Sequence, residues 1–418
     1  MGFDISSDIY FVYPKRCVHQ SLKPTVVHVR SASTNRSIEM KSVAKFHEHW
    51  SQVNTSRNVK RLVAATLYGT QISPRLVWSA LRGKAIVFMF HRVLPPLECA
   101  EYYDRERVIS TSAFDPLLKF LKKNFLMLSF ADLLNGLQGS PPDRPVCCLT
   151  FDDGWQDNYR CAWPALLRHR LSATVFLTLD YIGRKHLLWP DELYRLWSGL
   201  GLTEKEQLWQ LVGARFCSFS AHQGPPEFGS LRRMVHRLAP EEREDLLEYL
   251  RQEVPSKAAT LPDRAFLNWD EIRLMMNDGV SYGSHTLTHP ALTNLSYHQV
   301  KKELHESKRA LEENLRQPVE WFAYPFGNFD AHIVAETRRA GYRAAATSVP
   351  ATARFQQPGS FLLPRVGLCE TMVTDRPAHF SEDILLLHLA KMLVWAEKAR
   401  FGVGLYSKKL DFSGQIVP

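Results

Sequence analysis

Two short segments carry side chains that can do hydrolytic chemistry. Asp152 and Asp153 follow the apolar run 146–149, which is typical of a buried strand that ends where the carboxylates begin. Much later in the chain, His285 and His289 stand four positions apart. One Asp with two His is a metal-ligand set of the open kind, which leaves positions for water and substrate. Together the two segments predict a divalent-metal site with a second carboxylate beside it.

The same residue types also have structural interpretations. An Asp pair before Gly154 can cap a helix or shape a turn, and a His pair in a loop is often only polar surface. Their occurrence together, each after an apolar strand-like segment, favours the metal site. Asp157 and Asn158 are expected to cap the helix that follows.

Composition describes an ordinary globular protein. Its 418 residues are 45% hydrophobic and 23% charged, enough for one decorated domain or two domains. The seven cysteines lack regular spacing, which predicts neither a disulfide framework nor a Cys-based zinc site and favours a reducing compartment. We find no apolar run long enough to span a membrane and no secretory signal pattern, so we expect a cytoplasmic location, with a membrane-peripheral one as the alternative.

The net charge of +9 is concentrated at the N-terminus. Residues 1–84 hold thirteen Lys/Arg against four Asp/Glu, whereas the rest of the chain is balanced. Such an arm can attract anionic lipid, nucleic acid or an acidic partner, and its other interpretation is a solvated, poorly ordered leader. The basic arm contains no nucleic-acid-binding motif and no platform of aromatic and basic residues, so we expect no nucleic-acid partner. Peripheral contact of this arm with a membrane stays an alternative. The sequence gives no signal for an oligomeric state.

After residue 84, strand-like and helix-like segments alternate. Strands are expected at 85–91, 126–130, 146–151, 174–178, 280–289 with its loop, 321–324 and 343–347. Helices are expected at 114–125 with Ser112 as N-cap, and at 131–137, 157–170, 269–278, 296–316, 330–340 and 381–400. This alternation predicts an α/β protein built on a parallel sheet or barrel, with its chemistry at the carboxyl ends of the strands.

The expected domain boundaries lie where the alternation of strands and helices begins, is interrupted and ends. Residues 1–84 form a basic, partly disordered and partly helical extension, and residues 85–375 form the barrel domain. Residues 183–262 interrupt the rhythm and read as a mostly helical insertion, while 376–418 supply a C-terminal helix and tail.

Three motifs resemble those of the NodB-homology polysaccharide deacetylases, also called carbohydrate esterase family four. They are Thr150 to Gly154, His285 to His289, and Ala323 to Gly327. The resemblance covers 85–180 and 265–370, about half of the chain. It implies a distorted, partly open (β/α) barrel and hydrolysis of N-acetyl groups on a glycan.

The resemblance also implies roles for individual residues. Asp153, His285 and His289 would bind a divalent metal, commonly Zn²⁺ in this family, and Asp152 would act as general base. The backbone N–H around Phe326 would help hold the oxyanion, in a motif that also brings Tyr324 and Pro325 to the substrate. Apart from the resemblance, Trp155, Tyr324 and Trp189 could stack on sugar rings, although such residues more often belong to the core.

Two positions depart from the family pattern. Many members carry Arg where this chain has Ala323, and that Arg orients the base carboxylate; Arg365 is our candidate for the role here. Members also place an acid His on a late strand. A circularly permuted branch instead has this His after an N-terminal strand, which His91 fits; His388 is the alternative.

The expected function is therefore metal-dependent removal of N-acetyl groups from amino sugars of a polysaccharide, oligosaccharide or lipid-linked glycan. The same site can hydrolyse another amide or an O-acetyl ester, because metal chemistry does not specify the leaving group. A non-catalytic glycan-binding relative is the third alternative, and Ala323 keeps it open.

Overall fold

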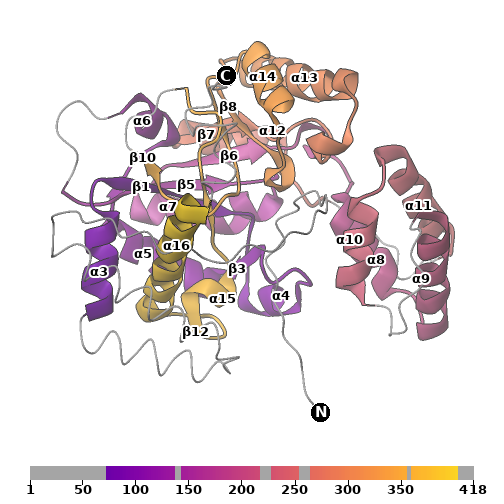
Figure 1. The fold of residues 1–418 in the computed structure, drawn as a ribbon, viewed down its shortest axis with the longest axis horizontal. Helices are drawn as coiled ribbons and strands as arrows, with labels where there is room; N and C mark the ends of the chain where they lie inside the picture. The colour runs from indigo at the N-terminus through magenta and orange to yellow at the C-terminus, as the bar shows by residue number, and fades with distance from the viewer. Residues whose placement is uncertain (1–71, 137–142, 217–226, 254–263, 355–358, 403–418) are drawn as a thin grey trace, which may run out of the picture. The chain divides into compact units, whose positions relative to one another are not determined.

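A sheet of parallel strands forms the centre of the computed structural model, which describes residues 72–136, 143–216, 227–253, 264–354 and 359–402 (Figure 1). Six strands lie side by side in chain order, each parallel to its neighbour. They are β1 (Lys84–Phe90), β5 (Val146–Phe151), β6 (Ala173–Leu177), β7 (Val280–Ser284), β8 (Trp321–Ala323) and β9 (Ala344–Ala346).

A single irregular segment, 360–367, joins the two edges of this sheet. On one side Leu363 N–H donates to the Ala345 carbonyl at 2.9 Å. On the other side the short strand β11 (Val366–Gly367) runs parallel to β1, with Val366 opposite Phe88. The sheet therefore curls into a barrel that is closed only by short pairings, and the predicted α/β class with a distorted, partly open barrel is confirmed.

Helices surround the sheet (Figure 1). They are α3 (Ile72–Leu81), α4 (Pro96–Glu101), α5 (Thr111–Asn124), α6 (Phe130–Asn135), α7 (Trp163–His169), α12 (Trp269–Asn277), α13 (Tyr297–Leu315), α14 (Ala331–Arg339), α15 (Glu370–Val373) and α16 (Glu382–Gly402). The remaining short strands are β2 (Arg92–Leu94), β3 (Val108–Ser110), β4 (Leu126–Met127), β10 (Ala353–Arg354), β12 (Thr374–Arg376) and β13 (His379–Phe380).

Alternate residues of each strand enter two different cores. Ile86, Phe88 and Leu149 belong to the larger cluster, which also contains the buried side chains of α5 and α13. Val87 and Cys148 point the other way, into a smaller cluster rich in Ala, because successive side chains of a strand face opposite sides. This inner cluster combines Ala side chains with larger ones, among them Phe176 and Trp321.

Four helices make up the described part of the insertion, as the sequence predicts. They are α8 (Trp189–Ser198), α9 (Leu202–Phe216), α10 (Phe228–His236) and α11 (Pro240–Glu253), drawn together in Figure 1. Leu193, Leu231 and Leu247 belong to a buried cluster formed almost entirely by these helices. The insertion therefore has an apolar core of its own.

Some local predictions need correction. The N-cap of α5 is Ser110, not Ser112, and its hydroxyl accepts a hydrogen bond from Ala113 N–H. Within the extension, Leu81 of α3 is fully buried in the main core. Residues 1–71 and 403–418 lie outside the described residues, so the domain boundaries stay predictions. No helix in the described part of the chain is long and apolar enough to cross a membrane.

Candidate active site

The predicted metal ligands meet at one edge of the sheet. Asp153 lies two residues after the end of β5, and His285 directly follows β7. Both strands run parallel, so their carboxyl ends share an edge. The chain turns sharply there, since Asp153 and His289 adopt left-handed backbone angles with φ of 72° and 58°. These uncommon conformations turn the side chains towards each other.

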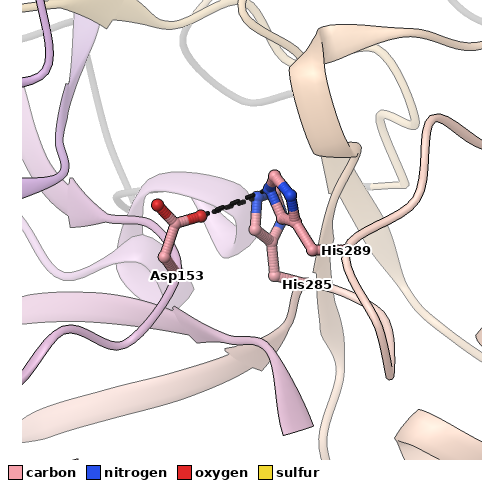
Figure 2. A group of neighbouring side chains, drawn as sticks. All are labelled: Asp153, His285 and His289. Atoms are coloured by element: carbon pink, nitrogen blue, oxygen red, sulfur yellow. Dashed lines mark ion pairs between the residues drawn. The ribbon is translucent and has the colours of Figure 1, made fainter. Parts of the chain in front are cut away.

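Asp153, His285 and His289 offer ligand atoms that all lie within 4.8 Å of one another (Figure 2). Asp153 Oδ1 is 3.6 Å from His285 Nε2 and 3.3 Å from His289 Nε2. All three side chains are buried, and Asp153 Oδ1 has no hydrogen-bond partner among the described residues. A buried carboxylate oxygen beside two imidazole nitrogens is costly unless a cation lies between them. These residues therefore fit a divalent metal.

The second oxygen of Asp153 is held by two donors. Arg107 Nη2 and Trp155 Nε1 each lie 2.9 Å from Asp153 Oδ2. They fix the carboxylate so that only Oδ1 faces the histidines. Burial would raise the pKa of Asp153, but Arg107 and the neighbouring histidines hold that pKa well below its usual value. The carboxylate is therefore ionised, as a metal ligand must be.

The histidine loop is fixed by hydrogen bonds behind it. His285 Nδ1 lies 2.8 Å from the Ala323 carbonyl, so this nitrogen carries the proton and Nε2 is free to bind a metal. Burial lowers the pKa of His285 to about 4, which keeps the ring neutral. Glu303 of α13 accepts from the N–H groups of Leu287 and Thr288, at 2.8 and 3.1 Å. Helix α13 thus anchors the loop between the two histidines.

Arg365 holds the proposed base. Its Nη1 and Nη2 lie 2.6 and 2.8 Å from the two carboxylate oxygens of Asp152, and its Nε donates to the Thr347 carbonyl. Burial would raise the pKa of Asp152, but Arg365 and then His285 outweigh it and the pKa is lowered. The closing segment of the barrel therefore supplies the cation that Ala323 does not, in the arrangement predicted for Arg365.

His91 lies at the end of β1, beside the two aspartates. Asn158 Nδ2 donates to the His91 carbonyl at 2.9 Å, and Asp157 accepts from Val93 N–H at 2.8 Å. The prediction that Asp157 and Asn158 cap a helix is therefore wrong: they tie the turn after β1 to the site. Burial and the Arg107 charge lower the pKa of His91 to about 4, against the opposing charges of the aspartates.

His388, the alternative acid, lies in the middle of α16. This helix packs against α3 and α15, which carry none of the predicted active-site residues. The structure therefore places His91, and not His388, beside the predicted metal ligands. That His91 acts as the acid, and that the chain is circularly permuted, stay predictions.

Trp155 and Tyr324 belong to the core, which is the more common role of such residues, and do not stack on a sugar. Trp155 is 1% exposed, with Phe266 stacked at 4.4 Å and the Arg92 guanidinium 4.3 Å from its ring. Tyr324 is equally buried and packs against Phe322 and Phe329. Neither ring can receive a sugar, because protein atoms already cover them. Both side chains instead belong to the packed interior next to the ends of β5 and β8.

Phe326 lies directly at the site. It follows the buried Pro325, takes a left-handed conformation with φ of 58°, and its ring centroid is 4.7 Å from that of His289. Its other neighbours are His236 and Trp189 of the insertion, at 4.7 and 6.4 Å. Phe326 therefore connects the metal-ligand loop to the insertion.

Arg107 and Glu303 were not predicted from the sequence. Arg107 lies in the loop between α4 and β3, where no apolar pattern or motif distinguishes it. Glu303 lies in α13 at a position that reads as one more charged residue of an amphipathic helix. Their contacts arise only when the barrel closes, so no local signal could identify them.

Comparisons with known proteins agree on one family. The polysaccharide deacetylase family model matches residues 139–222 and 239–345. YxkH of Bacillus subtilis (strain 168), whose description as a polysaccharide deacetylase is itself provisional, is 22% identical over 229 residues. That match covers 55% of this chain and 53% of YxkH, so the chain spans about half the length of this relative.

Solved deacetylase structures are also similar. Streptococcus pyogenes deacetylase PplD, solved in complex with acetate, matches with 19% identity and a TM-score of 0.45, over 69% of this chain and 94% of PplD. IcaB from Ammonifex degensii matches with 17% identity and a TM-score of 0.45, over 75% of this chain and 97% of IcaB. By its family model and its relative, this chain is similar to the polysaccharide deacetylases over residues 139–222 and 239–345.

Proposed function

We propose that this protein is a metal-dependent hydrolase that removes N-acetyl groups from amino sugars of a glycan. Similarity to the polysaccharide deacetylases supports deacetylation as the reaction class. The observation that carries the proposal is the unpartnered Asp153 Oδ1, buried between His285 and His289, next to Asp152 held by Arg365. Two imidazoles and one carboxylate suit Zn²⁺ and leave positions for substrate.

An acetamide resists hydrolysis because its carbonyl is a poor electrophile and its nitrogen is a poor leaving group. A divalent ion at the Asp153 site would polarise the acetyl carbonyl and make water a better nucleophile. Asp152 takes up the proton that water loses as its oxygen attacks the carbonyl carbon. Arg365 keeps Asp152 ionised and fixes its direction, so that the base is ready before substrate arrives.

Completion of the reaction requires breaking the C–N bond and protonating the amine. Backbone N–H of Phe326 is our candidate donor to the oxyanion, because this residue lies against His289. His91 is our candidate donor to the amine. Since the pKa of His91 is about 4, its ring is neutral beforehand, so it would first receive the proton that Asp152 took from water and then pass that proton to the amine nitrogen. Acetate and the free amino sugar are the products.

Other substrates of the same site stay open to test. An O-acetyl ester or another amide would use the same base and metal, and a panel of such compounds separates them by acetate release. The non-catalytic alternative rests on Ala323, but Arg365 supplies a cation to Asp152, which supports catalysis. The basic extension lies largely outside the described residues, so contact with a membrane or a lipid-linked glycan stays a prediction.

The direct test is acetate release from N-acetylglucosamine oligomers by the purified, metal-loaded protein. Asp152→Asn should lower kcat by about 10²- to 10⁴-fold, the usual contribution of a general base. Its metal content should not change, because Asp152 is not among the proposed ligands. Wild-type protein that binds metal but releases no acetate from any panel member would contradict the proposal.

A further inference from the structure

The insertion places a partly exposed imidazole beside the loop of the proposed metal ligands. His236 is the last residue of α10, and its ring centroid lies 4.7 Å from that of Phe326. The Phe326 ring lies in turn 4.7 Å from the ring of His289, one of these ligands. Both His236 and Phe326 are partly exposed, so both are in contact with solvent. A single aromatic ring therefore stands between this imidazole of the insertion and the proposed metal site.

Contacts from the insertion and from the barrel hold His236 in place. The buried Trp189 of α8 stacks on its ring, with 6.1 Å between the centroids and 28° between the ring planes. Asn294, which follows the histidine loop in the barrel, donates from Nδ2 to the His236 carbonyl at 3.2 Å. With Phe326 on another side, the imidazole has little freedom left to lose when a ligand binds to it, which favours binding.

The fold does not use the two ring nitrogens of His236. Neither nitrogen is hydrogen-bonded to a described residue, and neither is among the buried polar atoms that lack a partner within the described ranges. By contrast, His285 Nδ1 lies 2.8 Å from the Ala323 carbonyl, and His305 Nε2 lies 2.8 Å from Glu336. Burial and then the Arg243 charge lower the pKa of His236 to about 4, so the ring is neutral near pH 7 and offers one donor and one acceptor.

We propose that His236 is a substrate-binding residue that hydrogen-bonds a hydroxyl of the glycan, on the side of Phe326 away from the metal ligands. A sugar hydroxyl both donates and accepts, so it can pair with either nitrogen of a neutral imidazole. Because the Phe326 ring separates His236 from His289, the role of His236 is recognition of the sugar and not attack on the acetamide. This inference rests on the proposed function, because it names a contact that the same site makes with its glycan.

The first test compares the kinetics of His236→Phe with those of Trp197→Phe. His236→Phe keeps a ring for Phe326 and Trp189 to pack on and removes both nitrogens. We expect KM for N-acetylglucosamine oligomers to rise about threefold to tenfold, the usual contribution of one neutral hydrogen bond, with kcat and metal content unchanged. Trp197 is a buried member of the same insertion core, where Lys205 lies 5.5 Å from its ring.

Trp197→Phe therefore controls for general loosening of the insertion, and it should lower Tm without changing KM. An unchanged KM in His236→Phe, or an equal rise of KM in both variants, would overturn the recognition role.

Substrate analogues that lack one hydroxyl provide the second test, which needs no turnover. Calorimetry measures the binding of N-acetylglucosamine oligomers and their monodeoxy analogues to Asp152→Asn and to Asp152→Asn/His236→Phe. The complete oligomer should bind Asp152→Asn about threefold to tenfold more tightly. One analogue should bind both proteins equally, because it already lacks the hydroxyl that His236 binds.

The outcomes of this binding test separate the inference from the proposed function. If every analogue keeps the difference between the two proteins, His236 binds no glycan hydroxyl and the inference is wrong, whether or not wild type releases acetate. If one analogue removes the difference but wild type releases no acetate from any substrate, the recognition role stands and the proposed function fails. No binding of the complete oligomer to either protein would overturn both.

Discussion

The strand ends and the insertion both lie next to the proposed metal site, but their buried polar groups are paired differently. At the strand ends, both oxygens of Asp152 are bound by Arg365, and one oxygen of Asp153 is bound by Arg107 and Trp155. Of the four oxygens of these two carboxylates, Asp153 Oδ1 alone is left unpaired among the described residues, although Nδ1 of His289 and the hydroxyl of Tyr324 are also buried there without a partner. In the insertion and the loop beside it, unpaired buried polar atoms occur on Asp191, Trp189 and Tyr103, without a set of metal-ligating groups around them.

This difference suggests a division of labour. Fixed geometry and satisfied charges suit groups that must act on reacting atoms, because preorganisation lowers the barrier. Variants at the strand ends should therefore change kcat or metal content.

The largest expected effect is that of Asp153→Ala. Removing this carboxylate takes away the unpaired Oδ1 and leaves two histidines, so bound metal should be lost. Acetate release should then fall by more than about 1,000-fold, because carbonyl polarisation and positioning are lost together. Metal analysis of the purified variant checks the cause. Full metal content in Asp153→Ala would show that the ion binds elsewhere. That result would contradict the assignment of the metal site to the strand ends.

Arg365→Met should unfold most easily. The Arg365 and Asp152 side chains are 1% and 4% exposed, and removing one member of a buried ion pair costs about 3–5 kcal/mol. Because Arg365 lowers the pKa of Asp152, the stability from this pair is present above the unfolded pKa and is lost as pH falls through the folded pKa. Urea unfolding at several pH values measures both effects. The double variant Arg365→Met/Asp152→Asn should recover much of the loss; equal stability of wild type and Arg365→Met would contradict the pairing.

Trp155→Phe should have a smaller and more specific effect. It removes the indole donor to Asp153 Oδ2 but keeps a ring that can stack on Phe266. Metal affinity should weaken about 10- to 100-fold, the usual effect of losing a hydrogen bond behind a ligand. Titration with Zn²⁺ against a competing chelator measures this. A higher KM with unchanged metal affinity would instead restore the sugar-stacking interpretation.

The metal-free protein should lose stability gradually in mild acid. Burial lowers the pKa of His91, His236 and His285 to about 4, from 6.5. Between these values the unfolded chain binds protons that the folded chain does not, so stability is complete above about pH 6.5 and falls towards pH 4. Urea unfolding of metal-free protein at pH 7.5 and pH 5 should differ by about 2 kcal/mol or more. Replacing His236 by Phe should reduce this difference, and a pH-independent result would show that these rings are accessible to solvent.

Much of the fold was predictable because strand and helix periods are local. The runs 85–91 and 146–151 nearly coincide with β1 and β5, and the insertion was recognised where the alternation stops. Asp152, Asp153 and the histidines were predictable because they lie directly after such strands. Arg365 was predictable as well, since it follows the last strand-like segment.

The rest of the site depends on contacts between distant segments. Arg107 reaches the centre from a loop, and nothing in its neighbouring residues marks it. Trp155 could be assigned neither to the substrate nor to the core with certainty, because exposed and buried tryptophans look alike in sequence. Only the positions of Phe266 and Arg92, more than 60 residues away on either side, decide that its ring is covered.

One measurement tests the central claim most directly: metal content and acetate release, determined on the same preparations of wild type, Asp152→Asn and Asp153→Ala. We predict about one divalent ion per chain in wild type and in Asp152→Asn, none in Asp153→Ala, and acetate release from N-acetylglucosamine oligomers by wild type alone. Equal acetate release by wild type and Asp153→Ala would contradict the claim that Asp153, His285 and His289 hold the metal on which hydrolysis depends.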